Sequence, residues 1–449
     1  MSGISLKRKV RDRLLEWKER SRGSTALMVN GARRVGKSYT CIEFARTEYA
    51  SSIIIDFNNM SPVVRDIFEN DSYDLDRFFF RISAFYKVKL HERDTVFVFD
   101  EVQMYPKARA LIKYLVADGR YDYIETGSLL SIRTNVKDIV IPSEEEGIDM
   151  FPLDFEEFLW AMGDPATMDV VRDSFDRLAP IGEAFHRNIM GTFRTYMMVG
   201  GMPQAVLKFI ESRDLNDVER VKRGILDLYR KDIAKFAGGD GPKVRGIFDK
   251  IPSQLAKKEK RFVLSALGRN ARLREFGDAF FWLYDSMIVN VCANASDPSY
   301  GLVMSEDDHR VKCYMGDTGL LVTQSMGLDM NEDPDIQRMI LFDRIGLNEG
   351  MFMENIVAQA FRSQGIGLFF YSRSGSGSKD RIEIDFLIRR GGKVCPVEVK
   401  SSSFARHVSL DKYRARFGER VGQPYILYQN DLMVRDGIVH LPLYMAMLL

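Results

Sequence analysis

The sequence predicts an α/β protein with a parallel, helix-covered sheet at its N-terminus, a helical middle and a second α/β domain at its C-terminus. Three observations support this fold class. Short apolar, β-prone runs alternate with helical segments through about the first 160 residues, which is typical of a parallel sheet. Residues 175–236 show a helical pattern. Residues 381–402 read as two acidic strands joined by a Gly-Gly turn.

The composition sets limits on the class of protein. A chain of 449 residues predicts two or three domains. Its 64 Lys and Arg residues nearly balance 63 Asp and Glu residues, so a nucleic-acid surface would have to be a local patch. Four scattered cysteines disfavour a disulfide framework or a zinc site and fit a reducing cytoplasm. No signal peptide is expected, because the N-terminus has no apolar core segment, and no membrane span is expected, because no apolar run reaches about 18 residues.

The stretch Leu27–Thr40, LMVNGARRVGKSYT, contains the pattern G-x-x-x-x-G-K-S between an apolar strand and a helical segment. Gly31 and Gly36 allow backbone angles that point successive amides inward, and the helix N-terminus adds further amides for phosphate oxygens. Lys37 would reach the β- and γ-phosphates of ATP, and Ser38 would bind Mg²⁺. A chance glycine turn is the alternative, which the flanking strand and helix disfavour. The predicted ATP-binding residues are Gly31, Ala32, Arg33, Arg34, Val35, Gly36, Lys37, Ser38 and Tyr39.

A second apolar strand, TVFVFDEVQ, ends in two acidic residues. Asp100 at the strand end would hold the Mg²⁺ through water, and Glu101 would polarise the attacking water. A strand that simply ends in solvated acids is the alternative, which the upstream glycine-rich turn makes less attractive. The pair favours hydrolysis of ATP, and it disfavours a kinase, for which no acceptor pocket is indicated.

A third strand lies in YDYIETGSLL and ends near Thr126 and Ser128. In ring-type ATPases a polar residue at this place senses the γ-phosphate, so either hydroxyl is a candidate, and an ordinary strand-to-turn junction is the alternative. Together with the strand SIIIDFNN, these runs predict a parallel sheet with the nucleotide at its C-terminal edge.

These motifs resemble the AAA-family P-loop ATPases that carry the C-terminal domain DUF4143. The segments that carry the resemblance are GARRVGKS, FVFDEVQ, ETGSLLSI, MFPLDFEEFLWA, YMMVGGMPQAV, ILDLYRKDIAKF, KCYMGDTGLL, FMENIVAQAF and IEIDFLI…PVEVKSS. The resemblance covers nearly the whole chain and implies an AAA-type domain. Many relatives have Gly-Arg after the sensor segment, but this chain reads RTNVKDIVIPSEEEGI there. An arginine finger is therefore not carried over, and Arg133 is the remaining candidate.

The middle of the chain is expected to be helical. We predict an AAA-type ATP-binding domain over residues 1–160, a helical lid-like region over 161–240, a winged-helix-like module over 241–325 and the C-terminal domain over 326–449. The segment GGMP, residues 200–203, predicts a sharp turn between helices, and a contact with nucleotide is the alternative.

The winged-helix prediction comes from two or three helices that precede a hairpin ending near HRVKCYMGD. A basic patch in this module would contact the phosphate backbone of DNA, and a solvated helix face is the alternative. The patch consists of Lys257, Lys258, Lys260, Arg261, Arg269, Arg272 and Arg274.

Near the C-terminus, RIEIDFLIRRGGKVCPVEVKSS reads as a hairpin whose polar face carries Asp385, Glu398 and Lys400. Two converging carboxylates can hold a divalent metal ion, and a nearby lysine can position a water molecule. The order of elements and the D…ExK spacing resemble the restriction-endonuclease-like fold. That resemblance implies Glu354, Asp385 and Glu398 as metal ligands and Lys400 as a catalytic residue.

The favoured hypothesis is a cytoplasmic ATPase, with ATP and Mg²⁺ as cofactors, that is coupled to a nuclease-like domain acting on DNA. Glu101, Lys37 and Lys400 are its predicted catalytic residues, and a homo-oligomer is a candidate assembly. The alternative is an ATP-switched factor that binds DNA or protein through a nuclease-like scaffold without catalytic activity.

Overall fold

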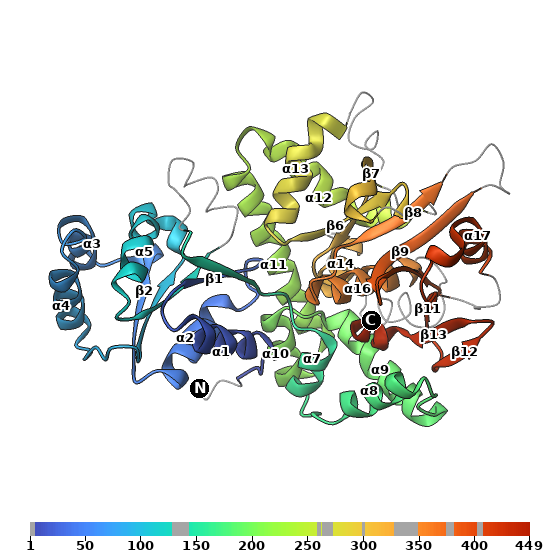
Figure 1. Cartoon of the computed structure of the whole chain (residues 1–449), viewed down its shortest axis with the longest axis horizontal. Helices are drawn as coiled ribbons and strands as arrows, with labels where there is room; N and C mark the ends of the chain where they lie inside the picture. Colours follow the sequence, from blue (N-terminus) through green and yellow to red (C-terminus); the bar gives the residue numbers. More distant parts are fainter. Residues whose placement is uncertain are drawn as a thin grey trace. The chain divides into compact units, whose positions relative to one another are not determined.

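The computed structural model of the chain describes residues 5–127, 143–257, 262, 273–298, 301–326, 349–373, 381–401 and 407–449. The chain forms two compact units. The N-terminal unit spans Lys7–Phe151, and the C-terminal unit comprises Pro152–Leu449. Figure 1 labels most of the elements of the two units, which are described separately below.

The N-terminal unit is a parallel sheet with helices on both faces, as predicted. Its strands are β1 (Ala26–Asn30), β2 (Ser51–Asp56), β3 (Thr95–Asp100), β4 (Asp122–Thr126) and β5 (Glu145–Asp149). Its helices are α1 (Val10–Ser21), α2 (Lys37–Glu48), α3 (Pro62–Asn70), α4 (Leu75–Tyr86) and α5 (Pro106–Asp118). The strand order is β2-β3-β4-β1-β5, and every pair is parallel. The fold matches that of a P-loop ATPase.

The two faces of this sheet bury different side chains because successive residues of a strand point to opposite sides. On β3, Phe97 and Phe99 pack in the cluster that contains residues of α3, α4 and α5. Val96 and Val98 pack in the cluster on the other face, with residues of α1 and α2. All four side chains are fully buried, which explains why the strand reads as a continuous apolar run.

The C-terminal unit begins with helices and continues into a large sheet. Its helices are α7 (Phe155–Ala161), α8 (Thr167–Arg177), α9 (Glu183–Val199), α10 (Pro203–Ser212), α11 (Leu215–Phe236), α12 (Gly241–Leu255), α13 (Leu273–Asp285), α14 (Thr318–Ser325), α16 (Glu349–Ser363) and α17 (Val408–Phe417). Its strands are β6 (Val289–Ala295), β7 (Glu306–Met315), β8 (Phe369–Arg373), β9 (Ile382–Arg390), β10 (Lys393–Val399), β11 (Tyr425–Tyr428), β12 (Met433–Arg435) and β13 (Ile438–Pro442).

The eight strands have the order β12-β13-β11-β10-β9-β8-β6-β7. The predicted acidic hairpin is present, because β9 and β10 pair antiparallel around Gly391 and Gly392. The order α16, β8, β9, β10, α17, β11 is also the predicted one. The hairpin of β6 and β7, expected as the wing of a separate module, instead continues this sheet, because β6 pairs with β8. The winged-helix module is therefore not confirmed.

The GGMP segment forms the predicted turn between α9 and α10. Gly200 has φ of +81°, and a Cβ atom on Gly201 would lie 2.1 Å from the carbonyl oxygen of Leu153. The amide of Gly201 donates to Asp317 Oδ2 at 2.6 Å, and Asp317 caps α14 through the amide of Leu320. The two glycines therefore allow a close backbone approach within the C-terminal unit, in line with the structural interpretation.

Candidate functional site

The glycine-rich turn connects β1 to α2 in the N-terminal unit. Gly36 has φ of +101°, a region that favours glycine, and Gly31 has φ of +157°. A Cβ atom on Gly31 would lie 2.4 Å from the carbonyl oxygen of Met150, so a larger residue does not fit there. Helix α2 begins at Lys37, and the first amides of a helix have no acceptor within it. The turn therefore has the backbone that an anion-binding loop requires.

The sheet topology brings three strand ends to this loop. Because β4 lies between β1 and β3, Thr126 at the end of β4 is next to both the loop and Asp100. The register agrees, since Val29 pairs with Thr126 and Phe99 pairs with Glu125. Residues that are far apart in the sequence therefore meet at the C-terminal edge of the sheet, where ligands bind in such folds.

Three polar side chains form a connected group at this edge. The hydroxyl of Ser38 donates to Asp100 Oδ1 at 2.6 Å. The hydroxyl of Thr126 donates to the same carboxylate oxygen and accepts from the amide of Glu101 at 3.3 Å. The structure thus brings together Ser38 and Asp100, the two predicted Mg²⁺ ligands, and Thr126, the predicted sensor. The oxygen donors fit a hard divalent cation.

Lys37 is buried beside this group. Its Nζ donates to the carbonyl oxygens of Gly31 at 2.8 Å and Ala32 at 3.1 Å. Burial lowers the pKa of Lys37, and the negative charges of Glu101 and Asp100 oppose that shift. The lysine is therefore held inside the glycine-rich turn, where it can reach a bound phosphate chain.

Glu101 has a left-handed backbone conformation, with φ of +55°. Such a conformation is unfavourable for a residue with a Cβ atom and is found at functional sites. The side-chain amide of Gln103 donates to the carboxylate of Glu101. Sequence reasoning missed Gln103, although its place two residues after the acid in DEVQ was visible. This contact orients the carboxylate that is predicted to activate water.

Arg8 also supports the loop and was not predicted. Its guanidinium donates to the carbonyl oxygen of Val35 at 3.0 Å and to that of Phe151 at 2.6 Å. The side chain is buried. Because Arg8 precedes α1 by only two residues and carries no motif, its sequence position gave no signal of this role.

The remaining predicted residues of the nucleotide site are partly buried in the loop, partly exposed on it, and partly outside the described residues. Ala32 and Val35 are buried, while Arg33, Arg34 and Tyr39 are exposed at the surface of the loop. Ser128, the second sensor candidate, and Arg133, the finger candidate, lie outside the described residues.

In the C-terminal unit the predicted acidic residues come together on β9 and β10. Asp385 Oδ2 accepts from the amide of Val399 at 2.9 Å. Glu398 is buried, and its Oε2 lies 2.6 Å from Lys400 Nζ. Burial raises the pKa of Glu398, and the neighbouring Lys400 acts against that rise. Lys400 is therefore already paired with one of the predicted metal ligands.

A second lysine, Lys312 on β7, lies among the same acidic residues and was missed. Its Nζ is near three carboxylates: 3.5 Å from Asp385 Oδ1, 3.6 Å from Glu354 Oε2 and 3.9 Å from Glu383 Oε1. Its side chain is 1 % exposed. No three His, Cys, Asp or Glu side chains within the described ranges are arranged as ligands of one metal ion. Glu354, Asp385 and Glu398 as metal ligands stay a prediction.

The predicted basic patch lies mostly outside what the structure describes. Lys257 is the described member, and its Nζ donates to Gln254 Oε1 at 2.9 Å. The backbone of Arg274 lies in α13 without a described side chain. The members outside the described residues are Lys258, Lys260, Arg261, Arg269 and Arg272.

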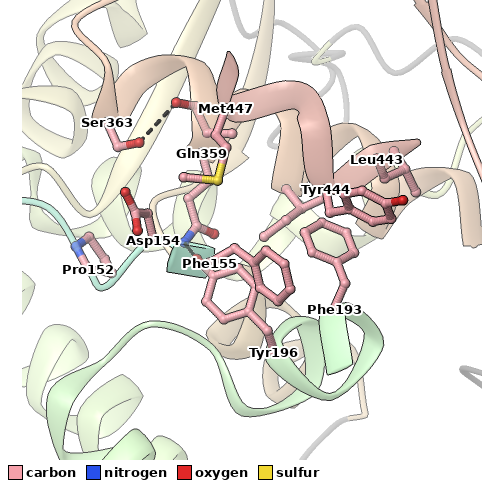
Figure 2. Close-up of a pocket in the computed structure, with 12 residues that line it drawn as sticks. Pro152, Asp154, Phe155, Phe193, Tyr196, Gln359, Ser363, Leu443, Tyr444 and Met447 are labelled. Atoms are coloured by element: carbon pink, nitrogen blue, oxygen red, sulfur yellow. Dashed lines mark hydrogen bonds between the residues drawn. The ribbon is translucent and has the colours of Figure 1, made fainter. Parts of the chain in front are cut away.

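The C-terminal unit also contains a small cavity lined mainly by aromatic and aliphatic side chains. Figure 2 shows Phe193 and Tyr196 of α9, Phe155 of α7 and Tyr444 around it. The side-chain amide of Gln359 donates to the hydroxyl of Tyr196 at 3.1 Å. The volume is about 20 Å³, enough for a single water molecule. This cavity is therefore a packing gap and too small for a nucleotide or a metabolite.

Among the helices that the structure describes, none combines the length and the apolar character needed to cross a membrane.

Comparison with family models identifies three segments. A model described as an AAA domain matches residues 23–159. Two models of domains of unknown function match further segments: DUF8612 over residues 190–332 and DUF4143 over residues 349–445. No curated protein matches the chain.

Three solved structures share features with the chain at low similarity. A Walker-type ATPase of Pyrococcus abyssi is 14% identical with a TM-score of 0.42, and the match covers 71% of this chain and 96% of that one. The Orc1 protein of Aeropyrum pernix in complex with DNA is 12% identical with a TM-score of 0.26, over 75% and 95% of the two chains. A protein of Vibrio cholerae is 10% identical with a TM-score of 0.18, over 94% and 95%. At these scores we base no argument on the three structures.

The family models and the geometry of the strand edge agree with each other. Residues 23–159 match an AAA domain and contain the glycine-rich turn and strand edge described above, and residues 349–445 match DUF4143.

Proposed function

We propose that the protein hydrolyses ATP with Mg²⁺ at the C-terminal edge of the N-terminal sheet. The observation that carries this proposal is the 2.6 Å hydrogen bond between Ser38 and Asp100, made next to a glycine-rich turn with the backbone of an anion-binding loop. The shared hydroxyl and carboxylate are the donors that a nucleotide-bound Mg²⁺ requires.

The roles of the residues follow from their positions. Lys37 would bind the terminal phosphates, and the first amides of α2 would bind the remaining phosphate oxygens. A bound Mg²⁺ would offset phosphate charge and would be held by Ser38 and Asp100. Glu101, oriented by Gln103, would accept a proton from the attacking water.

The test is ATP turnover by the full chain and by Lys37→Ala. We expect the substitution to abolish measurable turnover, because it removes the buried ammonium that would bind the terminal phosphates of ATP. Lys113→Ala is the matched control, since Lys113 is exposed on α5 and lies in the same unit. Equal turnover by all three proteins would reject the proposal.

We further propose that the C-terminal domain binds DNA without cutting it, which is the DNA-binding form of the alternative from the sequence, an ATP-switched factor that binds DNA or protein. The observation that favours binding over cleavage is the ammonium of Lys312 in the middle of the acidic residues that would otherwise hold a metal ion. Positive charge for phosphate contacts is available at the turn between β9 and β10, where Arg389, Arg390 and Lys393 are exposed.

Supercoiled plasmid distinguishes the two hypotheses for this domain. Wild type and Lys400→Ala are each incubated with plasmid, ATP and either Mg²⁺ or Mn²⁺. Intact plasmid with retarded migration in a gel supports DNA binding without cleavage. Nicking by the wild type and not by Lys400→Ala would support the nuclease, and intact plasmid without retardation would reject DNA as the partner.

A further inference from the structure

The acid cluster of the C-terminal unit consists of Glu354 on α16, Glu383 and Asp385 on β9, and Glu398 on β10. Four carboxylates in a partly buried place require compensation by positive charge. In nuclease-like folds that charge is a divalent metal ion in direct contact with carboxylate oxygens.

The centre of the acid cluster is taken by a side chain of the protein itself. The Nζ of Lys312 is less than 4 Å from oxygens of Asp385, Glu354 and Glu383, each on a different carboxylate. It also lies 5.1 Å from the centre of the Phe370 ring, which favours a cation. The hydrogen-bond geometry leaves the ammonium without a directed acceptor, so the attraction is ionic.

The carboxylate oxygens of the cluster also have partners other than Lys312. Asp385 Oδ2 accepts from the amide of Val399, and Glu354 Oε2 accepts from the hydroxyl of Tyr314 at 3.0 Å. The carboxylate of Glu398 is paired with Lys400. A metal ion bound to these oxygens would have to displace the ammonium and compete with these contacts.

The charge state of Lys312 agrees with this arrangement. Burial alone lowers the pKa of a lysine, but the negative charges of Glu354, Asp385 and Glu383 outweigh that effect and raise the pKa of Lys312 above its ordinary value. The three carboxylates around its Nζ therefore favour the charged form of this side chain.

We propose that Lys312 is the resident cation of the acid cluster, so that the cluster binds no divalent metal ion. The DUF4143 domain then keeps its acidic residues as part of a charge-compensated core, and its contact with a partner does not depend on a metal. This inference deepens the proposal that the domain binds without cutting, and it rests on that proposal.

The first test counts metal ions directly. Mn²⁺ binding is measured by electron paramagnetic resonance without nucleotide, for the wild type and for Asp385→Asn. The variant keeps an oxygen acceptor for the amide of Val399 but loses the negative charge. We expect both proteins to bind the same number of Mn²⁺ ions per chain. Loss of one ion in Asp385→Asn would overturn the proposal.

The second test removes the resident cation. In Lys312→Met an apolar side chain of similar length replaces the ammonium, and the acid cluster becomes available to a metal ion. We expect Mn²⁺ to raise the melting temperature of Lys312→Met by about 2–4 °C more than it raises the melting temperature of the wild type. That gain should disappear in the double variant with Asp385→Asn.

Lys222→Met is the matched control for loss of a buried lysine. Lys222 is 3 % exposed, but its Nζ pairs with a single carboxylate, Glu219, and with backbone carbonyls. Mn²⁺ should not stabilise this variant. Equal Mn²⁺ effects on Lys312→Met and Lys222→Met would contradict the proposal. If Lys312→Met does not fold, the Mn²⁺ count on wild type and Asp385→Asn still decides.

These measurements separate the inference from the proposed function. Plasmid cleavage reports on DNA as substrate, whereas Mn²⁺ binding without nucleotide or DNA reports on the acid cluster alone. An uncut but retarded plasmid, together with a Mn²⁺ ion at Asp385, would leave DNA binding in place and reject the role of Lys312.

Discussion

The strand edge of the N-terminal unit and the acid cluster of the C-terminal unit use similar residues to different ends. In both, a buried lysine lies close to carboxylates that the strands of a sheet bring together. At the first, Lys37 donates to backbone carbonyls, and the carboxylate of Asp100 is approached by the hydroxyls of Ser38 and Thr126. In the second, the carboxylates surround the ammonium of Lys312. The first arrangement can accept a cation from solution, while the second already contains one.

The comparison shows that a list of acids and lysines does not define a metal site. Whether the acids can bind a metal ion depends on where the ammonium of the lysine lies. The ammonium of Lys312 lies among the carboxylates, whereas that of Lys37 donates to backbone carbonyls. Substitutions of the acids and lysines in the two units test this difference.

Glu101→Gln should lower ATP turnover by about 10²–10⁴-fold, the usual contribution of a general base. The glutamine keeps the size of the side chain and a hydrogen-bonding group for Gln103, so nucleotide binding should remain. Steady-state kinetics and nucleotide titration measure the two quantities separately. Undiminished turnover would mean that Glu101 does not activate water.

Lys312→Met should lower the free energy of unfolding by about 3–5 kcal/mol, because three carboxylates lose their buried cation. Urea unfolding, followed by tryptophan fluorescence, measures this change in the absence of metal. A loss below about 1 kcal/mol would show that the ammonium does not hold the acid cluster together.

A buried group in the N-terminal unit provides a third case, in which two carboxylates share one cation. Arg109 lies 2.8 Å from Glu125 and 2.9 Å from Glu145. Burial raises the pKa of Glu125 to about 8, although Arg109 acts against that rise. Because the folded pKa is above the ordinary carboxyl value of 4.5, the stability due to protonation is complete at acid pH and is lost as pH rises through about 8.

The free energy of unfolding should therefore depend on pH through Glu125. Between about pH 6 and pH 9 the wild type should lose about 2–3 kcal/mol more than Glu125→Gln, whose amide does not titrate. Denaturant unfolding at the two pH values provides the comparison. Identical pH slopes for the two proteins would show that Glu125 is ionised throughout, as in an ordinary ion pair with Arg109.

Lys400→Met should have the smallest effect of the four, a loss of about 1 kcal/mol of unfolding free energy. Lys400 pairs with Glu398, but its side chain is 30 % exposed, so water compensates for part of the lost interaction. The same urea experiment measures it beside Lys312→Met. An equal or larger loss in Lys400→Met would contradict the central place given to Lys312.

Much of the N-terminal site could be predicted because its signals are local. The spacing from Gly31 to Ser38 and the acids at the end of β3 each lie in a short segment, and parallel strands bring such segments to one edge. Gln103 and Arg8 were missed for a different reason. The role of Gln103 depends on its side-chain contact with Glu101, and the role of Arg8 depends on contacts with residues far away in the sequence. Neither residue belongs to a sequence motif.

The acid cluster was predicted less completely. Period-two alternation places Asp385 and Glu398 on the polar faces of β9 and β10, and the hairpin is present. Lys312 could not be predicted, because β7 was interpreted as part of a separate wing. Only the order of strands in the eight-stranded sheet places β7 in the same sheet as β9. Long-range strand order of this kind has no local signature in a single sequence.

The most direct test of the account is a calorimetric titration of the full chain with ATP in the presence of Mg²⁺, repeated for Lys37→Ala. We predict a saturable heat of binding for the wild type that is lost or weakened at least about tenfold in the variant. No heat with folded wild-type protein, or the same affinity in both proteins, would contradict the assignment of the nucleotide site.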